Sequence, residues 1–226
     1  MPSLWSAVSL SLQVALGCCA MGLPVALPLG WYLARGHGKV KTVVGLLVLV
    51  PLVLPPVVTG LLLLEVLGRS SALGSLLASL GMPVTFSLFG AVIAAFVVGL
   101  PLHVLCIRAA FEGIDPRIEE MGLTLGLTPR QVALRVSLPL AFPGILAGTV
   151  LCFARALGEF GATVVVAGNL EGRTRTIALA VYSLLEAPGG EAAVALLTAS
   201  SIALAAACLV IFEALNRWYR RRLGLV

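Results

Sequence analysis

Residues 108–139 read RAAFEGIDPRIEEMGLTLGLTPRQVALRVSLP, a polar stretch inside a chain whose other long segments are almost entirely apolar. The chain is 60% hydrophobic and 11% charged, and its mean hydropathy is +1.09. These values lie well outside the range of soluble domains and indicate that hydrocarbon surrounds most residues. We therefore predict an all-α, polytopic membrane protein in which 108–139 lies outside the bilayer.

Five apolar stretches surround this segment, and each is long enough to cross a membrane. A spanning helix needs about 20 residues at a rise of about 1.5 Å each. The predicted spans are 7–34, 42–67, 86–107, 140–167 and 193–215, and the first two contain Pro24, Pro28, Pro51, Pro55 and Pro56, which predict kinks. The apolar segments 71–80 and 176–187 are too short to cross, so we predict a short helix at the membrane surface for each.

Basic residues are distributed unevenly between the two sides that these spans define. Lys and Arg in short loops are retained in the cytoplasm. One side carries eleven, namely Arg35, Lys39, Lys41, Arg108, Arg117, Arg130, Arg135, Arg217, Arg220, Arg221 and Arg222, and the other carries Arg69, Arg173 and Arg175. We therefore expect the amino terminus outside, and the carboxyl terminus and 108–139 in the cytoplasm. Because a cleaved signal peptide begins with a basic region and Arg35 follows the first apolar run, none is expected.

The remaining composition argues against several classes of function. The net charge is +5, but the basic residues are distributed as the orientation rule requires and form no patch interleaved with aromatic residues. We therefore expect no nucleic-acid binding. The five cysteines lie within or at the ends of spans without metal or redox spacing, so we expect packing roles and no metal site. The sequence offers no combination of a nucleophile with a general base that would indicate an enzyme. We expect structural roles for Glu65 and His103, near the ends of the second and third spans.

The first part of 108–139 has the pattern of a short helix. Asp115 is suited to the N-cap and Pro116 to the first helical position. Glu119 and Glu120 then fall in the first turn, where the helix dipole favours acids. We expect the helix to stop near Gly126.

Thr128 and Pro129 have the form of a second helix start, and the amphipathic run that follows leads to Pro139. The segment is therefore predicted to form two short helices joined by a glycine turn. The pattern alone is equally compatible with a solvated hairpin that only joins two spans.

The spacing within this segment resembles the coupling motif of permease subunits of ATP-binding-cassette importers. In that family the motif is EAA, three residues, G, nine residues, an aliphatic residue, one residue and LP, and here residues 120–139 read EMGLTLGLTPRQVALRVSLP. Met121 and Gly122 stand where the family usually has alanine, and Val136 stands where isoleucine is common. The resemblance implies that 1–226 is a single type I importer transmembrane domain with 108–139 as its coupling loop. The coupling residues that it implies are Glu119, Glu120, Gly122, Gly126, Thr128, Arg130, Leu138 and Pro139.

The resemblance also implies a transport subunit without chemistry of its own. The sequence has no GxxxxGK[ST] phosphate loop, so we expect no cofactor on this chain, and ATP and Mg²⁺ on a separate ATPase subunit present in two copies. Closure of the ATPase dimer would then rock the spans to alternate access. The family further implies a second copy of this chain around a central path, location in the bacterial inner membrane, and an extracytoplasmic binding protein that contacts the loops at 69–85 and 168–192.

Two charged residues lie about midway through the predicted fourth span. Arg155 and Glu159 are spaced i,i+4, so one face of a helix would carry both. Charges at this depth usually face a bundle interior or a wet cavity. They either neutralise each other as an ion pair, or Arg155 lends positive potential to a path that an anion travels. Thr163 and Asn169, nearer the outer end, are candidates to line the entrance of that path.

Three further strings resemble molybdate permease subunits: PLVLPPVVTG at 51–60, RALGEFGAT at 155–163 and GRTRTIALAVYSLLEAPGGE at 172–191. The resemblance implies molybdate as the substrate, with tungstate alongside because the two oxyanions are close in size and charge. Sulfate permeases carry a similar RALGE run, so sulfate or another tetrahedral oxyanion stays open. An ATP-independent anion channel is the alternative from another class, and the lack of rings of polar residues argues against it.

Overall fold

The computed structural model describes residues 2–222, apart from the side chains of residues 2, 3, 220 and 222, so the outermost residues of the predicted 1–226 domain and the Arg220 and Arg222 side chains lie outside it. Within the described part the chain is helical, without strands. The helices are α1 Pro2–Arg35, α2 Lys39–Val53, α3 Pro56–Leu67, α4 Ala72–Ser79, α5 Leu88–Glu112, α6 Pro116–Thr124, α7 Pro129–Val132, the π-helix η1 Ala133–Ser137, α8 Leu138–Leu157, α9 Gly161–Ala167, α10 Ile177–Leu185 and α11 Glu191–Arg222. The predicted all-α class is confirmed.

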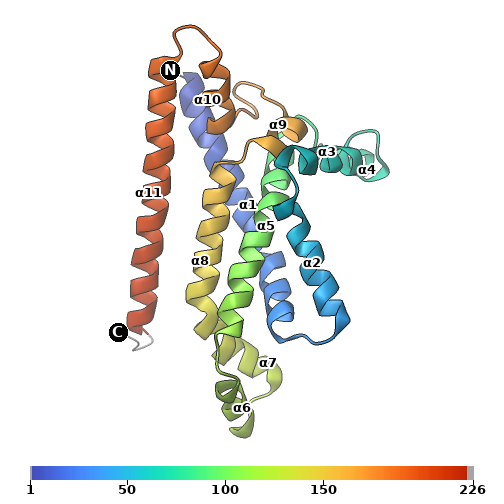
Figure 1. Ribbon diagram of the computed structural model, residues 1–226, viewed down its shortest axis with the longest axis vertical. Helices are drawn as coiled ribbons and strands as arrows, with labels where there is room; N and C mark the ends of the chain where they lie inside the picture. Colours follow the sequence, from blue (N-terminus) through green and yellow to red (C-terminus); the bar gives the residue numbers. More distant parts are fainter. Residues whose placement is uncertain (1, 223–226) are drawn as a thin grey trace.

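Helix α5 packs against both α1 and α8, and these three helices lie together in the bundle (Figure 1). Small residues let these helices approach closely, as expected where van der Waals packing, and not the hydrophobic effect, drives association in lipid. A Cβ atom on Gly30 of α1 would lie 2.5 Å from Cγ2 of Ile107, and one on Gly144 of α8 would lie 2.4 Å from Cβ of Ala110. The peripheral helix α11 is largely exposed, in contrast to α5.

Within residues 2–222, four helices are long and apolar enough to cross a membrane: α1, α5, the continuous helix from Pro129 to Leu157, and α11. The predicted span over 42–67 is broken at the prolines that predict kinks, because α2 and α3 meet at 113°. Leu54 between them is extended, with ψ 142°, since Pro55 disfavours the helical conformation in the residue before it. Pro56 opens α3 at its first turn. A fifth crossing segment exists if this bent pair counts as one span.

Helix α3 lies across the bundle, and α3 and α4 project sideways at the end where α5 begins (Figure 1). It packs closely on α9, because a Cβ atom on Gly60 would lie 2.9 Å from Cα of Ala162. The short helices predicted at 71–80 and 176–187 are confirmed as α4 and α10.

The predicted fourth span, 140–167, is wrong at both ends. The helix starts at Pro129 and runs through η1 into α8, and it stops at Leu157. Gly158 is its C-cap, with φ −91° and ψ 7°, and α9 begins at Gly161 after the break.

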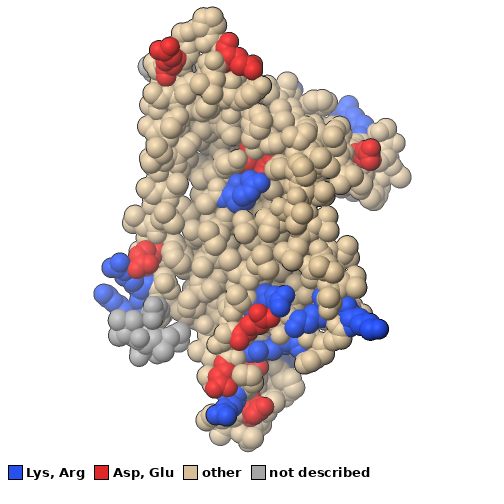
Figure 2. Space-filling model, in the orientation of Figure 1, with Lys and Arg blue, Asp and Glu red and all other residues tan. Residues whose placement is uncertain are grey.

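The two ends of the bundle carry different features (Figure 1). The amino terminus lies at one end, whereas the carboxyl end of α11 lies at the other end together with α6 and α7. Charged side chains gather toward these ends, and one small charged patch lies midway along an otherwise uncharged face (Figure 2).

Candidate functional site

The segment predicted as the coupling loop folds as a helical hairpin at one end of the bundle (Figure 1). Helix α6 starts where the sequence indicates, because the Asp115 carboxylate accepts a hydrogen bond from the backbone N–H of Arg117 at 2.9 Å. Helix α7 starts with a reciprocal capping box. The Gln131 N–H donates to Oγ1 of Thr128 at 3.3 Å, and the Thr128 N–H donates to Oε1 of Gln131 at 2.8 Å. Both predicted helix starts are confirmed.

The turn between the two helices depends on the backbone of Gly126. Its φ is +86°, a conformation that residues with a Cβ atom rarely adopt. The Leu127 N–H donates to the Gly122 carbonyl at 3.1 Å and the Gly126 N–H donates to the Leu123 carbonyl at 3.0 Å, which is the Schellman arrangement. A Cβ atom on Gly126 would meet nothing within 4 Å. Glycine is therefore required for backbone conformation and not for space.

Gly122 holds the two helices of the hairpin together. It is buried, and a Cβ atom there would lie 3.1 Å from Cγ2 of Val132 on α7. Met121, the departure from the family pattern beside it, is 63% exposed. The small residue is thus needed inside the hairpin, while Met121 adds to its outer surface.

The outer face of α6 is apolar. Ile118, Met121 and Leu125 are spaced as neighbours on one side of a helix, and their exposed fractions are 43%, 63% and 81%. Glu120 and Arg130 are also exposed. A contiguous exposed apolar patch rimmed by polar residues is typical of a protein interaction site, and a short amphipathic helix is typical of docking into a groove.

Glu119 ties the hairpin to the long helices. Its Oε1 accepts from Nη2 of Arg35, the last residue of α1, at 2.9 Å and from Oγ of Ser137 in η1 at 2.7 Å. From the sequence, Glu119 is expected in the first turn of a helix and, through the resemblance, as a coupling residue; Arg35 serves there only to orient the chain, and Ser137 has no predicted role. Glu119 lies 84 positions after Arg35 and 18 positions before Ser137, so no local sequence pattern predicts these contacts.

The second helix does not stop at Pro139, so the prediction of two separate short helices is wrong. Pro139 has no N–H for the carbonyl of Arg135, and its ring would clash with that carbonyl in a regular α-helix. The chain avoids the clash with the π-helix η1, in which the Leu138 N–H donates to the Ala133 carbonyl. The carbonyl of Pro139 also accepts from the Tyr219 hydroxyl on α11 at 2.9 Å. The hairpin is therefore one continuous body with α8.

The ion pair expected in the fourth span is present. Nη1 of Arg155 lies 2.6 Å from Oε2 of Glu159, although Glu159 lies in the break after α8 and not on the same helix. The other Glu159 oxygen accepts from the Ala162 N–H at 2.9 Å. The side chains are 30% and 2% exposed, respectively. Arg155 thus neutralises a buried carboxylate and also reaches the surface. Residues 136–170 contain no other charge, which makes the pair isolated within this long apolar stretch.

Thr163 and Asn169 are held within the chain's own packing. Thr163 is fully buried, and its Oγ1 has no hydrogen-bond partner among the residues that the structure describes. Asn169 donates to the Ser183 hydroxyl at 2.7 Å and accepts from Nε of Arg175 at 2.8 Å. Their part in lining a path stays a prediction, and for Thr163 it requires the helices to move.

His103 and two of the cysteines lie buried in the packing between the long helices. His103 is fully buried, and its Nε2 lies 3.1 Å from Oγ1 of Thr149. Because α5 continues to Glu112, His103 lies farther from the helix end than predicted. Cys18 and Cys152 form no disulfide, and their thiols are buried together in the core and hydrogen-bonded with the sulfurs 3.5 Å apart. Within residues 2–222, no cluster of three His, Cys, Asp or Glu side chains could hold a metal ion.

Known proteins match this chain in sequence and in fold. Residues 26–224 match the family described as binding-protein-dependent transport system inner membrane component. The chain belongs to this family, and it is a permease subunit of an ATP-binding-cassette importer located in the inner membrane. Its relatives are transport subunits and not enzymes.

More particular relatives extend over nearly the whole chain. The molybdenum transport system permease protein ModB of Escherichia coli (strain K12) is 45% identical over 221 residues, which cover 97% of this chain and 96% of that protein. The protein of the same name from Haemophilus influenzae is 42% identical over 220 residues, with 97% and 96% coverage.

Solved structures support the fold. The methionine transporter MetNI, in an inward-facing conformation, aligns with a TM-score of 0.72 at 15% identity over 96% of this chain and 94% of that chain. A bacterial transporter for the acidic polysaccharide alginate aligns with a TM-score of 0.71 at 20% identity over 98% and 80%. The predicted type I importer fold is confirmed.

Proposed function

We propose that this chain is the permease subunit of an ATP-driven importer for molybdate that also accepts tungstate. The observation that carries the substrate assignment is 45% identity over 97% of the chain to a molybdenum transport permease. The fold alone does not select a substrate, because transporters for methionine and alginate share it.

The chain works as a homodimer around a central path. The support is Arg155, whose side chain is 30% exposed in the middle of an apolar stretch. A guanidinium at membrane depth is costly against hydrocarbon, so its face belongs against water or protein. Two copies with these faces together would place two Arg155 side chains beside a shared path. Their positive potential favours a dianion, while Glu159, which pairs with Arg155 in the same chain, keeps anion binding weak enough for release.

Coupling to ATP runs through the α6–α7 hairpin. Its apolar outer face is suited to a groove on the ATPase subunit, which holds ATP and Mg²⁺ and is present in two copies. Displacement of the hairpin reaches the middle of the membrane directly, because the helix from Pro129 to Leu157 is continuous. Its 29 residues span about 43 Å. Arg155 lies in the last turn of this helix, so the ion pair is at the end of the helix opposite the hairpin.

The hairpin end faces the cytoplasm together with the carboxyl terminus, and the amino terminus lies outside. The distribution of Lys and Arg supports this orientation. The opposite end, with the loops at 69–85 and 168–192, then receives the extracytoplasmic binding protein.

The test is reconstitution of the permease with its ATPase and binding protein in proteoliposomes. ATP hydrolysis and oxyanion uptake are measured with molybdate, tungstate and sulfate in parallel. We expect molybdate and tungstate to stimulate both activities and sulfate to have a much smaller effect. Equal stimulation by sulfate would overturn the substrate assignment, and uptake without the ATPase subunit would point to a channel.

A further inference from the structure

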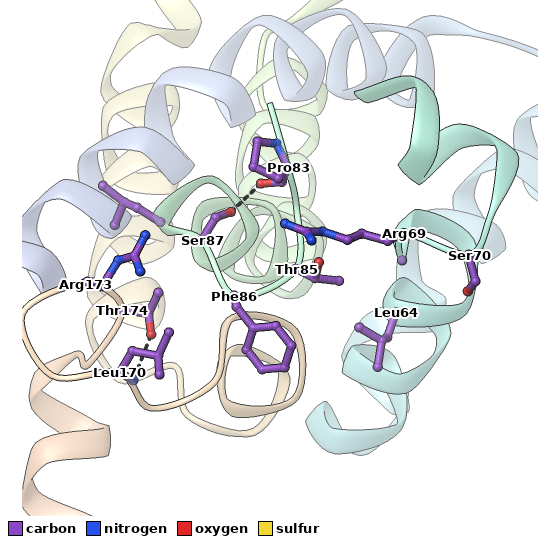
Figure 3. Close-up of a pocket in the computed structure, with 12 residues that line it drawn as sticks. Leu64, Arg69, Ser70, Pro83, Thr85, Phe86, Ser87, Leu170, Arg173 and Thr174 are labelled. Carbon is purple, nitrogen blue, oxygen red and sulfur yellow. Dashed lines mark hydrogen bonds between the residues drawn. The ribbon is translucent and has the colours of Figure 1, made fainter. Parts of the chain in front are cut away.

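A pocket of about 850 Å³ lies beside α3 and the start of α5 (Figure 3), at the end of the bundle away from the hairpin (Figure 1). Its walls come from three segments: the turn after α3 at 68–70, the segment before α5 at 83–88, and the loop after α9 at 170–174. The segment at 170–174 lies within the loops that the family resemblance assigns to the binding protein, and the other two segments overlap those loops. Neither the hairpin nor the Arg155 pair contributes to this pocket.

The pocket is rich in hydrogen-bond donors without partners. Arg69, Ser70, Thr85 and Arg173 line it, and none of these four side chains makes a hydrogen bond or ion pair within the described part of the chain. Asp and Glu are absent from the described residues that line it. The pocket is therefore a concave surface with two positive charges and no carboxylate of its own.

The acidic residues nearest in sequence do not neutralise these arginines. Glu171 is occupied by Arg175, with Oε2 3.3 Å from Nη1. Glu65, four positions before Arg69, is exposed on α3 and forms no ion pair within residues 2–222.

Both arginines are carried by turns that hydrogen bonds hold in place. Beside Arg69, the Ser71 hydroxyl donates to the Val66 carbonyl at 2.7 Å and accepts from the Gly74 N–H at 2.9 Å. The Arg173 N–H donates to the Leu170 carbonyl at 3.1 Å. In Figure 3, Arg69 extends inward from one wall and Arg173 stands on the opposite wall, with Ser87 between them. Both arginines are therefore carried by hydrogen-bonded turns that border the same pocket.

The third wall is tied to the second by Phe86. Its N–H donates to the Val166 carbonyl at 3.0 Å, although its φ of +54° is unfavourable for a residue with a bulky side chain. A Cβ atom on Gly168 would lie 2.9 Å from the Phe86 ring, so glycine makes room for the aromatic side chain. The segment at 83–88 is therefore anchored to the end of α9 and to Gly168, just before the loop at 170–174.

We propose that this pocket is an anion-binding site that takes a free tetrahedral oxyanion between Arg69 and Arg173. Guanidinium groups match the oxygens of such anions with paired N–H donors, and the Ser70 and Thr85 hydroxyls supply two further donors. The open shape keeps the ion partly hydrated, which suits brief residence. The binding rests on the chemistry of the pocket, whereas its role as the reception point of the transported ion rests on the proposed function.

The test measures binding directly and does not depend on transport. The permease–ATPase complex is purified in phosphate-free maltoside detergent and dialysed to equilibrium against sodium molybdate, and bound molybdenum is quantified by mass spectrometry. We expect saturable binding that weakens at least tenfold in R69Q and in R173Q. The control R217Q removes one charge at the opposite end, from a residue that pairs with Glu213, and should bind like the wild type. Unchanged binding in the R69Q/R173Q double variant would overturn the site.

Two further arms separate this site from its alternatives. Phosphatidylglycerol is added to the detergent complex, because a lipid headgroup carries the same phosphate chemistry. Displacement of molybdate by low lipid concentrations would reassign the pocket to lipid. The variant R155Q tests independence from the proposed path: it should keep outer-pocket binding even if uptake is lost. Loss of binding in R155Q alone, with R69Q and R173Q unaffected, would place the anion at Arg155 and overturn the inference.

Discussion

The guanidinium of Arg35 at the end of α1 lies 2.9 Å from the carboxylate of Glu119 on α6, so two segments 84 residues apart in sequence are joined at the root of the hairpin. Ser137 of η1 donates to the same oxygen at 2.7 Å. A single carboxylate therefore links the first long helix, the hairpin and the start of α8. A force on α6 is consequently shared by three elements.

We expect Glu119→Gln to loosen this link and to uncouple ATP hydrolysis from uptake. The pair is partly exposed, so the loss of unfolding free energy should be only about 1 kcal/mol. The measurement is the number of ATP molecules hydrolysed per oxyanion imported, which should rise. The matched control is Glu112→Gln, which breaks an exposed ion pair with Arg108 in α5 and should leave the ratio unchanged. An unaltered ratio in Glu119→Gln would remove the linking role.

Replacement of Gly126 should disturb the turn through its backbone alone. Gly126→Ala places a Cβ in a region with φ +86°, and we expect a loss of about 1 kcal/mol without any steric clash. A bulky residue there should also uncouple ATP hydrolysis from transport while the dimer still assembles. Gly113→Ala is the control, because Gly113 has φ −73° and ordinary space around it. Thermal unfolding and uptake are measured for both, and full transport in the bulky variant would contradict the coupling role.

Met121 and Gly122 should separate docking from hairpin stability. Met121→Ala removes exposed apolar surface, so we expect weaker co-purification of the ATPase with unchanged thermal stability. Gly122→Leu forces a side chain against Val132 and should lower stability by about 1–3 kcal/mol. Gly122→Ala, the residue that the family usually has, should be tolerated because only the end of the Val132 side chain must shift. If Met121→Ala leaves ATPase affinity intact, the outer face of α6 is not the docking surface.

The ion pair can be tested by comparing single and double substitutions. Arg155→Gln strands the Glu159 carboxylate, which is 2% exposed, and should lower the unfolding free energy by about 3 kcal/mol. In the double variant with Glu159→Gln no buried charge remains, so most of that stability should return. Oxyanion uptake should stay low in both if Arg155 lines the path. Recovery of uptake together with stability in the double variant would show that the arginine is only structural.

Capping residues made the hairpin predictable. Asp115 before Pro116 and Thr128 before Pro129 are local signals, and the structure places both helix starts there. The spans were predictable as a class because apolar length alone identifies them. Their boundaries were less predictable, since hydropathy does not register a break within an apolar run.

The breaks have physical causes that only the packed structure weighs. Pro55 and Pro56 were visible as kink sites, yet the turn of 113° depends on α3 packing against α9. Pro139 suggested a helix end, but the π-helix η1 lets the helix continue through this residue. Glu159 has the i,i+4 spacing of a helical pair, but Gly158 ends α8 before it. Contacts such as Arg35 with Glu119 join distant segments and have no local pattern.

The π-helix η1 at Ala133–Ser137 sets the angle, around the helix axis, between the direction of the hairpin and the directions of the α8 side chains. One residue beyond the regular helical repeat turns everything that follows by about 100° around the axis, since each residue of an α-helix advances by that angle. Deleting a single residue from this π-helix would keep every side chain of the outer face of α6 and of the membrane segment, yet point the two in new directions. The alignment of the two working faces is therefore specified by residue count, in addition to residue identity.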